Sequence, residues 1–206
     1  MDGYSILIQD QHMIHEMIQS YFDKVYTSFE ADIKKTLHFK GNEIYGEIFY
    51  YSAIKLIKYL GVTPEDHFLD IGSGIGKLAF YVYFASQAAS VTGIEINSAR
   101  HAIAIQVSEV IQTQLPRMFE HREFSLVEGN FLESNFDRTT IVYICSTIFS
   151  YDLLEKIGLT LNTMPHIRKI ASFRKLPFLS NFTCVKKMLI HCSWERVGCY
   201  IYERNI

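Results

Sequence analysis

Apolar residues recur at steps of three and four along the first part of the chain, from about Asp10 to Leu37. This period is typical of an amphipathic helix, so we expect a helical segment with at most one break. A second helical pattern runs from Ile48 to Leu60 and ends at Gly61, a residue suited to a helix C-cap. The glycines of the intervening segment HFKGNEIYGE predict a loop.

Strand-like and helical runs alternate over the middle of the chain. The strand-like runs are HFLDIG, VTGIEI, FSLVEG and TIVYIC, and the helical runs are KLAFYVYFASQA, SARHAIAIQVSEVIQTQL and SYDLLEKIGLTLNTM. This order predicts a parallel sheet with helices on both faces. We expect Ser98 to cap the second of these helices and the aromatic residues of FYVYFA to lie in the core.

After Pro165 the pattern changes, because strand-like runs follow one another without a long helix between them. A terminal antiparallel hairpin fits this pattern best. The expected fold is therefore α/β and Rossmann-like, a mostly parallel seven-stranded sheet with a C-terminal antiparallel hairpin. We expect an N-terminal helical extension over residues 1–40 and one ligand-binding domain over residues 41–206.

Composition sets limits on function. The 206 residues are 49% hydrophobic and 20% charged, as in ordinary globular domains, and the net charge of −2 gives no support for binding a polyanion. The N-terminus lacks the basic region of a signal peptide, and no apolar run reaches the ~18 residues that span a bilayer. We expect a soluble, cytoplasmic protein with no membrane or nucleic-acid partner.

The cysteines show neither a disulfide framework nor a metal site. None of them forms a close-spaced pair, and they lie in strand-like surroundings at Cys145, Cys184, Cys192 and Cys199. We expect reduced thiols in the core and no metal.

The motif Asp70-Ile71-Gly72-Ser73-Gly74-Ile75-Gly76 follows a predicted strand and opens a helix. A dinucleotide site has the spacing G-x-G-x-x-G and binds a pyrophosphate, whereas this motif has G-x-G-x-G after an acid. S-adenosylmethionine has no phosphate and carries an amino group that suits Asp70. The motif therefore favours S-adenosylmethionine as cofactor, with Gly72, Ser73, Gly74 and Gly76 in the loop around it.

Polar residues end the next two strands. Glu95 can accept hydrogen bonds from both ribose hydroxyls, a role that nicotinamide sites share. After the third strand, Asn130 can bind the adenine amino group and Phe131 can stack on the ring. With the motif at Asp70, this pattern predicts a class I methyltransferase, a class in which the sheet also ends in a reversed strand.

Several segments share the order and spacing of one branch of that class. They are Ile44-Tyr45-Gly46-Glu47, Leu69 to Gly76, Gly93-Ile94-Glu95 and Gly129-Asn130-Phe131. The chain resembles the disruptor-of-telomeric-silencing histone-lysine methyltransferases, which are of the non-SET kind, and their bacterial look-alikes. The likeness covers roughly Glu43 to Phe149, with a weaker echo at Cys192-Ser193-Trp194.

The resemblance implies that Tyr45 and Glu47 fold over the methionine end of the cofactor. It also implies an aromatic-lined channel for a lysine, with the matching positions in the segment from Tyr143 to Phe149 and with Trp194 as a further wall candidate. The eukaryotic members carry an asparagine pair where Cys145-Ser146 stands and an aspartate at the position of Asn130. The resemblance thus implies the reaction type more firmly than histone as the substrate.

Burial among aromatic side chains lowers the pKa of an arriving lysine, so no strong base is needed. Ser146 and Thr147 can orient the amine, although Ser and Thr at a strand end are more often simple caps. No Asn-Pro-Pro-Tyr or Asp-Pro-Pro-Tyr follows the fourth strand, which argues against base or glutamine methylation. The interpretations open at this point are a protein-lysine methyltransferase, a small-molecule or RNA methyltransferase, and a catalytically silent cofactor-binding or interaction module.

Overall fold

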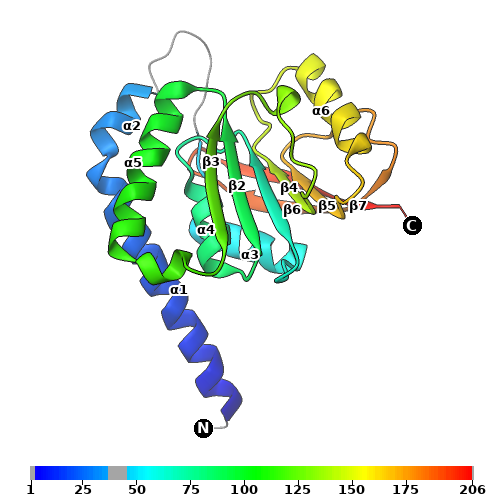
Figure 1. Ribbon diagram of the computed structural model, residues 1–206. Helices are drawn as coiled ribbons and strands as arrows, with labels where there is room; N and C mark the ends of the chain where they lie inside the picture. Colours follow the sequence, from blue (N-terminus) through cyan, green and yellow to red (C-terminus); the bar gives the residue numbers. More distant parts are fainter. Residues whose placement is uncertain (1–2, 37–45, 206) are drawn as a thin grey trace.

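The computed structural model describes residues 3–36 and 46–205 of the chain. Its strands form one sheet in the order β3-β2-β1-β4-β5-β7-β6 (Figure 1). Their bounds are β1 His67–Ile71, β2 Ser90–Glu95, β3 Glu123–Glu128, β4 Ile141–Ile144, β5 Lys169–Ser172, β6 Phe182–His191 and β7 Arg196–Arg204. Strands β1 to β5 pair in parallel, whereas β7 is antiparallel to both β5 and β6. The predicted sheet and its terminal hairpin are confirmed.

Helices cover both faces of the sheet (Figure 1). On one face lie α3 (Tyr50–Leu60), α4 (Lys77–Ala85) and α5 (Ser98–Gln114), and on the other lies α6 (Tyr151–Thr163). The alternation of side chains along β1 explains the two layers, since Phe68 packs into the core on the α4 side while Leu69 and Ile71 pack on the α6 side.

The N-terminal segment forms two helices, α1 (Gly3–Ser28) and α2 (Glu30–Thr36), with the single expected break at Phe29. Phe22 is fully buried, and its ring centre lies 5.4 Å from that of Tyr81 and 5.2 Å from that of Phe84. The second half of α1 therefore belongs to the same core as α4. The predicted boundary at residue 40 falls outside the described residues and stays a prediction.

Two helix starts differ from those that the sequence predicts. Asn97, not Ser98, caps α5, because the extended backbone of Asn97 lets its side chain accept a hydrogen bond from the Arg100 N–H. Ser98 is already helical and donates to Glu128 instead. The helix expected from Ile48 begins at Tyr50, because Ile48 forms a β-bridge with Cys192.

Gly61 ends α3 as expected, with φ 60° in the left-handed region. The predicted core position of the aromatic residues in α4 is also confirmed, since Phe80, Tyr81 and Tyr83 are almost completely buried. Both features follow from local sequence signals.

An ion pair between the buried Asp66 carboxylate and the partly exposed Arg168 joins the amino ends of β1 and β5. Asp66, which is 2% exposed, accepts hydrogen bonds from the Arg168 guanidinium at 2.6 Å and from the Thr63 N–H at 2.7 Å. Burial by itself would raise the pKa of Asp66, but these bonds and one from Thr140 lower it to about 2. The pair therefore lies at the amino ends of the strands, whereas the cavity described below lies at their carboxyl ends.

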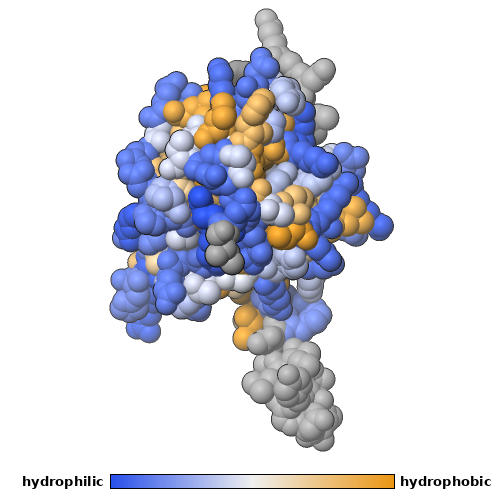
Figure 2. Space-filling model, turned by 90° about the vertical axis from the view of Figure 1, so that its right-hand side faces the viewer, coloured by the Kyte–Doolittle hydropathy of each residue, from blue (hydrophilic) through white to orange (hydrophobic). Residues whose placement is uncertain are grey.

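Polar side chains cover most of the face on which α6 lies, with hydrophobic areas mainly in its upper half (Figure 2). Helix α6 itself buries Leu154, Ile157 and Leu161, at helical spacing, against the sheet. Within the described ranges, no helix is long and apolar enough to cross a membrane.

Candidate active site

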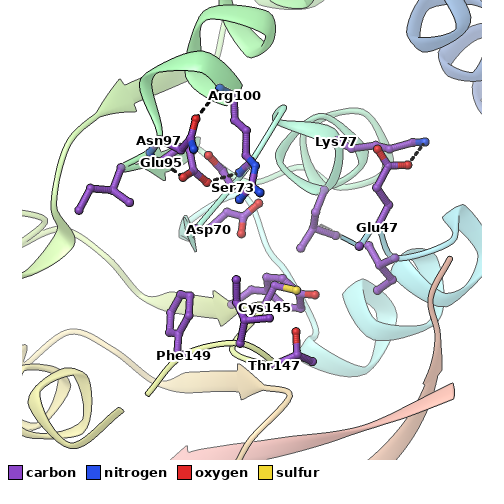
Figure 3. A pocket seen from close by; sticks show the side chains of 18 of the residues that line it. Glu47, Asp70, Ser73, Lys77, Glu95, Asn97, Arg100, Cys145, Thr147 and Phe149 are labelled. Carbon is purple, nitrogen blue, oxygen red and sulfur yellow. Dashed lines mark hydrogen bonds and ion pairs between the residues drawn. The ribbon is translucent and has the colours of Figure 1, made fainter. Parts of the chain in front are cut away.

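A cavity of about 640 Å³ lies at the carboxyl ends of β1, β2 and β4. Strand β1 has β2 on one side and β4 on the other, so the strand order reverses at β1. The cavity lies at this switch point, where ligands bind in open α/β folds. Figure 3 shows its side chains. They come from the loop before α3, the end of β1 and the loop after it, the start of α4, the end of β2 and the start of α5, and the end of β4 and the segment after it.

The loop after β1 presents backbone to the cavity. The N–H groups of Gly72 and Ser73 both donate to the carbonyl of Ile94, at 2.9 and 3.0 Å. Gly72 has φ 77°, and a Cβ built there would lie 3.3 Å from the Phe149 ring. A side chain at residue 72 would be strained and crowded, so only glycine leaves this wall open to a ligand.

Glu95 is buried at the end of β2, with 6% of its surface exposed. Its two carboxylate oxygens accept hydrogen bonds from the N–H groups of Gly74 and Asn97, each at 2.8 Å. The carboxylate thus holds the glycine loop against the start of α5. Each oxygen keeps a further lone pair for a hydroxyl donor in the cavity.

Asp70 is the most deeply buried acid of the cavity, with 2% of its surface exposed. Its Oδ1 atom has no hydrogen-bond partner among the described residues. Burial, followed by the charge of Glu95, raises the pKa of Asp70 to about 8. A buried acid with an unused oxygen fits a cationic donor such as the amino group of S-adenosylmethionine.

Glu47 lies across the cavity from Glu95 and pairs with Lys77, with 2.6 Å between Oε2 and Nζ (Figure 3). The backbone of residue 47 is tied to the turn between β6 and β7, because its N–H donates to the Ser193 hydroxyl at 3.1 Å and its carbonyl accepts from the Ser193 N–H at 2.8 Å. The loop before α3 therefore closes one side of the cavity.

Thr147 and Phe149 line the cavity after β4, whereas Ser146 is not among the residues that line it. The Ser146 hydroxyl is fully buried, lies 2.9 Å from that of Ser172 and accepts a hydrogen bond from the Arg174 N–H at 2.9 Å. Ser146 thus positions the segment that carries Thr147 and Phe149.

Trp194 does not line the cavity but lies against the loop that does. A Cβ built at Gly46 would lie 1.9 Å from the Trp194 ring. The indole also packs near Phe173, with ring centres 6.4 Å apart, and Phe173 meets Tyr143 edge to face at 5.6 Å. A row of aromatic rings therefore leads from the cavity wall at Tyr143 to the Glu47 loop.

The remaining predicted residues lie beside the cavity or outside the described chain. Asn130 caps a short 3-10 turn, η2 (Phe131–Glu133), by accepting from the Leu132 N–H at 3.1 Å. Phe131 is buried and stacks on Phe136. Neither residue is among those that line the cavity, and their role at adenine stays a prediction. Gly76 ends the glycine loop ahead of α4, and Tyr45 lies outside the described residues.

Several cavity residues were not predicted from the sequence. They are Ile48, Lys77, Leu78, Ile96, Asn97, Arg100, Ser150 and Leu153. Lys77 directly follows the glycine motif, and Arg100 lies in the first helical turn after β2. Their nearness to these motifs in the sequence is the signal that could have identified them as cavity residues. Burial and then the charge of Asp70 raise the pKa of Cys145 to about 12, so its thiol is neutral.

The strand order, the glycine loop and the buried acids define an S-adenosylmethionine-dependent methyltransferase of class I. The fold resembles that of a putative RNA methyltransferase from Pyrococcus horikoshii, with a TM-score of 0.56 at 14% identity over 76% of this chain and 83% of that one. It also resembles M. capricolum TrmK in complex with S-adenosylhomocysteine, with a TM-score of 0.53 at 16% identity over 74% of this chain and 67% of that one. At such low sequence identities the likeness shows a shared fold and nothing further.

The sequence places the chain within this class. The model of the family "Histone methylation protein DOT1" matches residues 25–189, so the chain belongs to this family. The predicted family and cofactor are thereby confirmed.

Two curated relatives are both described as "Histone-lysine N-methyltransferase, H3 lysine-79 specific". The Caenorhabditis elegans protein is 26% identical over 155 residues, which are 71% of this chain and 16% of that protein. The Drosophila melanogaster protein is 30% identical over 115 residues, which are 52% of this chain and 6% of that protein. The chain therefore spans less than a fifth of the length of these relatives.

Proposed function

We propose that this protein transfers the methyl group of S-adenosylmethionine to the amine of a lysine side chain in a protein. The observation that carries the proposal is the neutral, partly aromatic wall that the end of β4 and the segment after it form in a chain of the DOT1 family. Burial keeps the Cys145 thiol and the Tyr143 hydroxyl protonated by raising the pKa of each, and Phe149 adds an apolar ring. Such a wall suits an acceptor that arrives without charge.

The residues on the acceptor side of the cavity promote methyl transfer by desolvating the lysine amine and orienting it. Transfer forms a nitrogen–carbon bond with the amine lone pair and breaks the carbon–sulfur bond of the sulfonium, whose electron pair stays on sulfur. Desolvation lowers the pKa of a lysine amine, so the neutral nucleophile forms without a dedicated base. The hydroxyl of Thr147 orients this amine, and Phe149 excludes water beside Gly72.

On the cofactor side, Asp70 and Glu47 receive the amino group of the methionine end, and Glu95 receives the ribose hydroxyls. The unused Oδ1 of Asp70 and the remaining lone pairs of Glu95 support these assignments. Asn130 and Phe131 bind adenine in this proposal, and Tyr45 closes the site together with Glu47.

The test is methyl transfer from labelled S-adenosylmethionine into a cell lysate, with aliquots treated with protease or ribonuclease. We expect label that ribonuclease leaves intact and protease solubilises, and acid hydrolysis of the labelled protein should yield methylated lysine. Mass spectrometry of the labelled band then identifies the acceptor.

Asp70→Asn serves as the inactive control, and Lys55→Gln, at an exposed position of α3, as the active one. Label that resists protease and disappears with ribonuclease contradicts the lysine proposal and identifies RNA as the acceptor. Label in a small soluble product contradicts it equally.

A further inference from the structure

Arg174 makes two contacts with residues 146–149, a segment that lies between β4 and α6. Its backbone N–H donates to the Ser146 hydroxyl at 2.9 Å, and its guanidinium donates to the carbonyl of Phe149. Ser146 and Phe149 are the first and last residues of the segment, in which Thr147 and Phe149 line the cavity. A single residue, two positions after the end of β5, therefore holds both ends of the segment.

The segment depends on such contacts because its own backbone gives it little support. It belongs to no helix or strand. Among the described residues, one backbone hydrogen bond closes it on itself, from the Phe149 N–H to the Ser146 carbonyl at 3.2 Å. The other support at Ser146 is the Ser172 hydroxyl, 2.9 Å away on β5. A loop of this kind takes its conformation from the elements beside it, and here that element is the end of β5.

The guanidinium contact is not explained by the needs of α6 or of Arg174. Ser150 caps α6 by accepting from the Leu153 N–H, and the Phe149 carbonyl lies directly before this cap. The positive end of the helix dipole disfavours a cation at this place. The ion pairs between described residues do not include Arg174, so no acid holds its guanidinium there. The contact therefore serves the Phe149 carbonyl.

Phe149 joins the segment to the loop that holds the cofactor. A Cβ built at Gly72 would lie 3.3 Å from the Phe149 ring. Figure 3 shows Thr147 and Phe149 on one side of Asp70, with Glu95 on the other. A shift of the segment would therefore move both side chains relative to the glycine loop.

We propose that Arg174 is a positioning residue for methyl transfer, which holds residues 146–149 in the conformation that places Thr147 and Phe149 beside the cofactor. Arg174 is not among the residues that line the cavity, so it acts through this segment and not on the reacting atoms. The inference rests on the assignment of the segment to the methyl acceptor under the proposed function, and not on whether that acceptor is a lysine.

The test measures methyl transfer from labelled S-adenosylmethionine into a cell lysate, counted in every acceptor, at a series of cofactor concentrations. Arg174→Met should lower the maximal rate by roughly 10- to 100-fold, because misplacement of an orienting group by about 1 Å costs on the order of 100-fold. The KM for S-adenosylmethionine and the Kd of S-adenosylhomocysteine from calorimetry should stay near their wild-type values. Arg174→Lys, which keeps a donor for the Phe149 carbonyl, should recover part of the rate.

Hydrogen exchange measured by mass spectrometry follows the segment directly and needs no acceptor. Arg174→Met should speed exchange in peptides that contain residues 146–149. The control is Arg117→Met, at an exposed position of the 3-10 turn η1 (Pro116–Phe119), which should change neither this exchange nor the rate.

Three outcomes would each overturn the inference. They are an unchanged maximal rate in Arg174→Met, a fall no larger than the loss of S-adenosylhomocysteine-binding sites in calorimetry, and equal losses in Arg174→Met and Arg174→Lys. Failure of the proposed function is seen separately, in the wild-type protein, as label in RNA or a small molecule instead of protein. A wild-type protein that labels no acceptor would overturn both.

Discussion

The indole of Trp194 lies against the Cα atom of Gly46, so closely that a Cβ at residue 46 would lie 1.9 Å from its Cε3 atom. This contact joins the loop before α3 to the turn between β6 and β7. Ser193 strengthens the junction through its two hydrogen bonds with the backbone of Glu47. The position of Glu47 in the cavity therefore depends on Ser193 and Trp194, which are far from it in the sequence.

Gly46→Ala should displace both Trp194 and the Glu47 loop, because the added methyl group cannot be accommodated without movement. Overpacking of this kind costs about 1–3 kcal/mol. Trp194 is the only tryptophan of the sequence, so its fluorescence emission should shift to longer wavelength, and binding of S-adenosylhomocysteine should weaken.

Gly61→Ala provides a matched control. It strains a backbone with φ 60° but meets no atom within 4 Å, so it should lower stability without changing the emission. An unshifted spectrum in Gly46→Ala would show that the contact does not hold the loop.

Asp70→Ala should weaken binding of S-adenosylhomocysteine by about 1.5–3 kcal/mol, the value of a hydrogen bond to a charged group. In the wild-type protein the affinity should also rise between pH 6 and pH 8, because the pKa of about 8 keeps Asp70 protonated until a cationic ligand binds. Calorimetry over this pH range measures both effects, and a flat profile in the wild-type protein contradicts the assignment of Asp70.

The same residue makes stability depend on pH. The pKa of Asp70 is raised in the folded protein from 3.8 to about 8, so between these values the folded state binds a proton that the unfolded state releases. The contribution of Asp70 to stability therefore falls as the pH rises from about 4 to about 8. Urea unfolding should show this decline in the wild-type protein and a smaller one in Asp70→Asn.

Arg168→Met should destabilise the fold by about 3 kcal/mol, because it leaves the buried Asp66 carboxylate without its ionic partner. The folded pKa of Asp66, about 2, is below its ordinary value of 3.8, so its stabilising contribution is complete above about pH 4 and is lost as the pH falls toward 2. The variant should lose most of this acid dependence in urea unfolding.

Arg138→Met is the matched control, since Arg138 pairs with Glu123 at 3.7 Å on the surface and 70% of its side chain is exposed. Its cost should be below about 1 kcal/mol. Equal costs for the two variants would rule out the stabilising role of the Asp66 pair.

Phe22→Ala should cost about 3–5 kcal/mol, the usual value for removing a buried aromatic ring. Phe22 is fully buried between α1 and α4, whereas Met17, on the same helix, is 66% exposed. Thermal unfolding should show one cooperative transition at a lower temperature for Phe22→Ala and little change for Met17→Ala. An unchanged transition in Phe22→Ala would mean that α1 unfolds separately from the sheet.

Sequence periodicity was sufficient to predict the alternation of strands and helices, the terminal hairpin and the helix end at Gly61. These features depend on short-range patterns and on the preferences of single residues. Helix starts were less well determined, as the cap at Asn97 shows, because Asn97 and Ser98 are both good capping residues and only the path of the chain after β2 decides between them.

By itself, the sequence determined the class of the protein, since the motif from Asp70 to Gly76 and the acid at Glu95 are local signals whose places in a parallel sheet follow from the order of elements. Only the tertiary structure decided that Ser146 turns to Ser172, that Trp194 packs on Gly46 and that Lys77 pairs with Glu47. The physical reason is that these contacts join residues far apart in the chain, 30 positions for Lys77 and Glu47 and 26 for Ser146 and Ser172. No local pattern encodes which of two distant side chains the folded chain brings together.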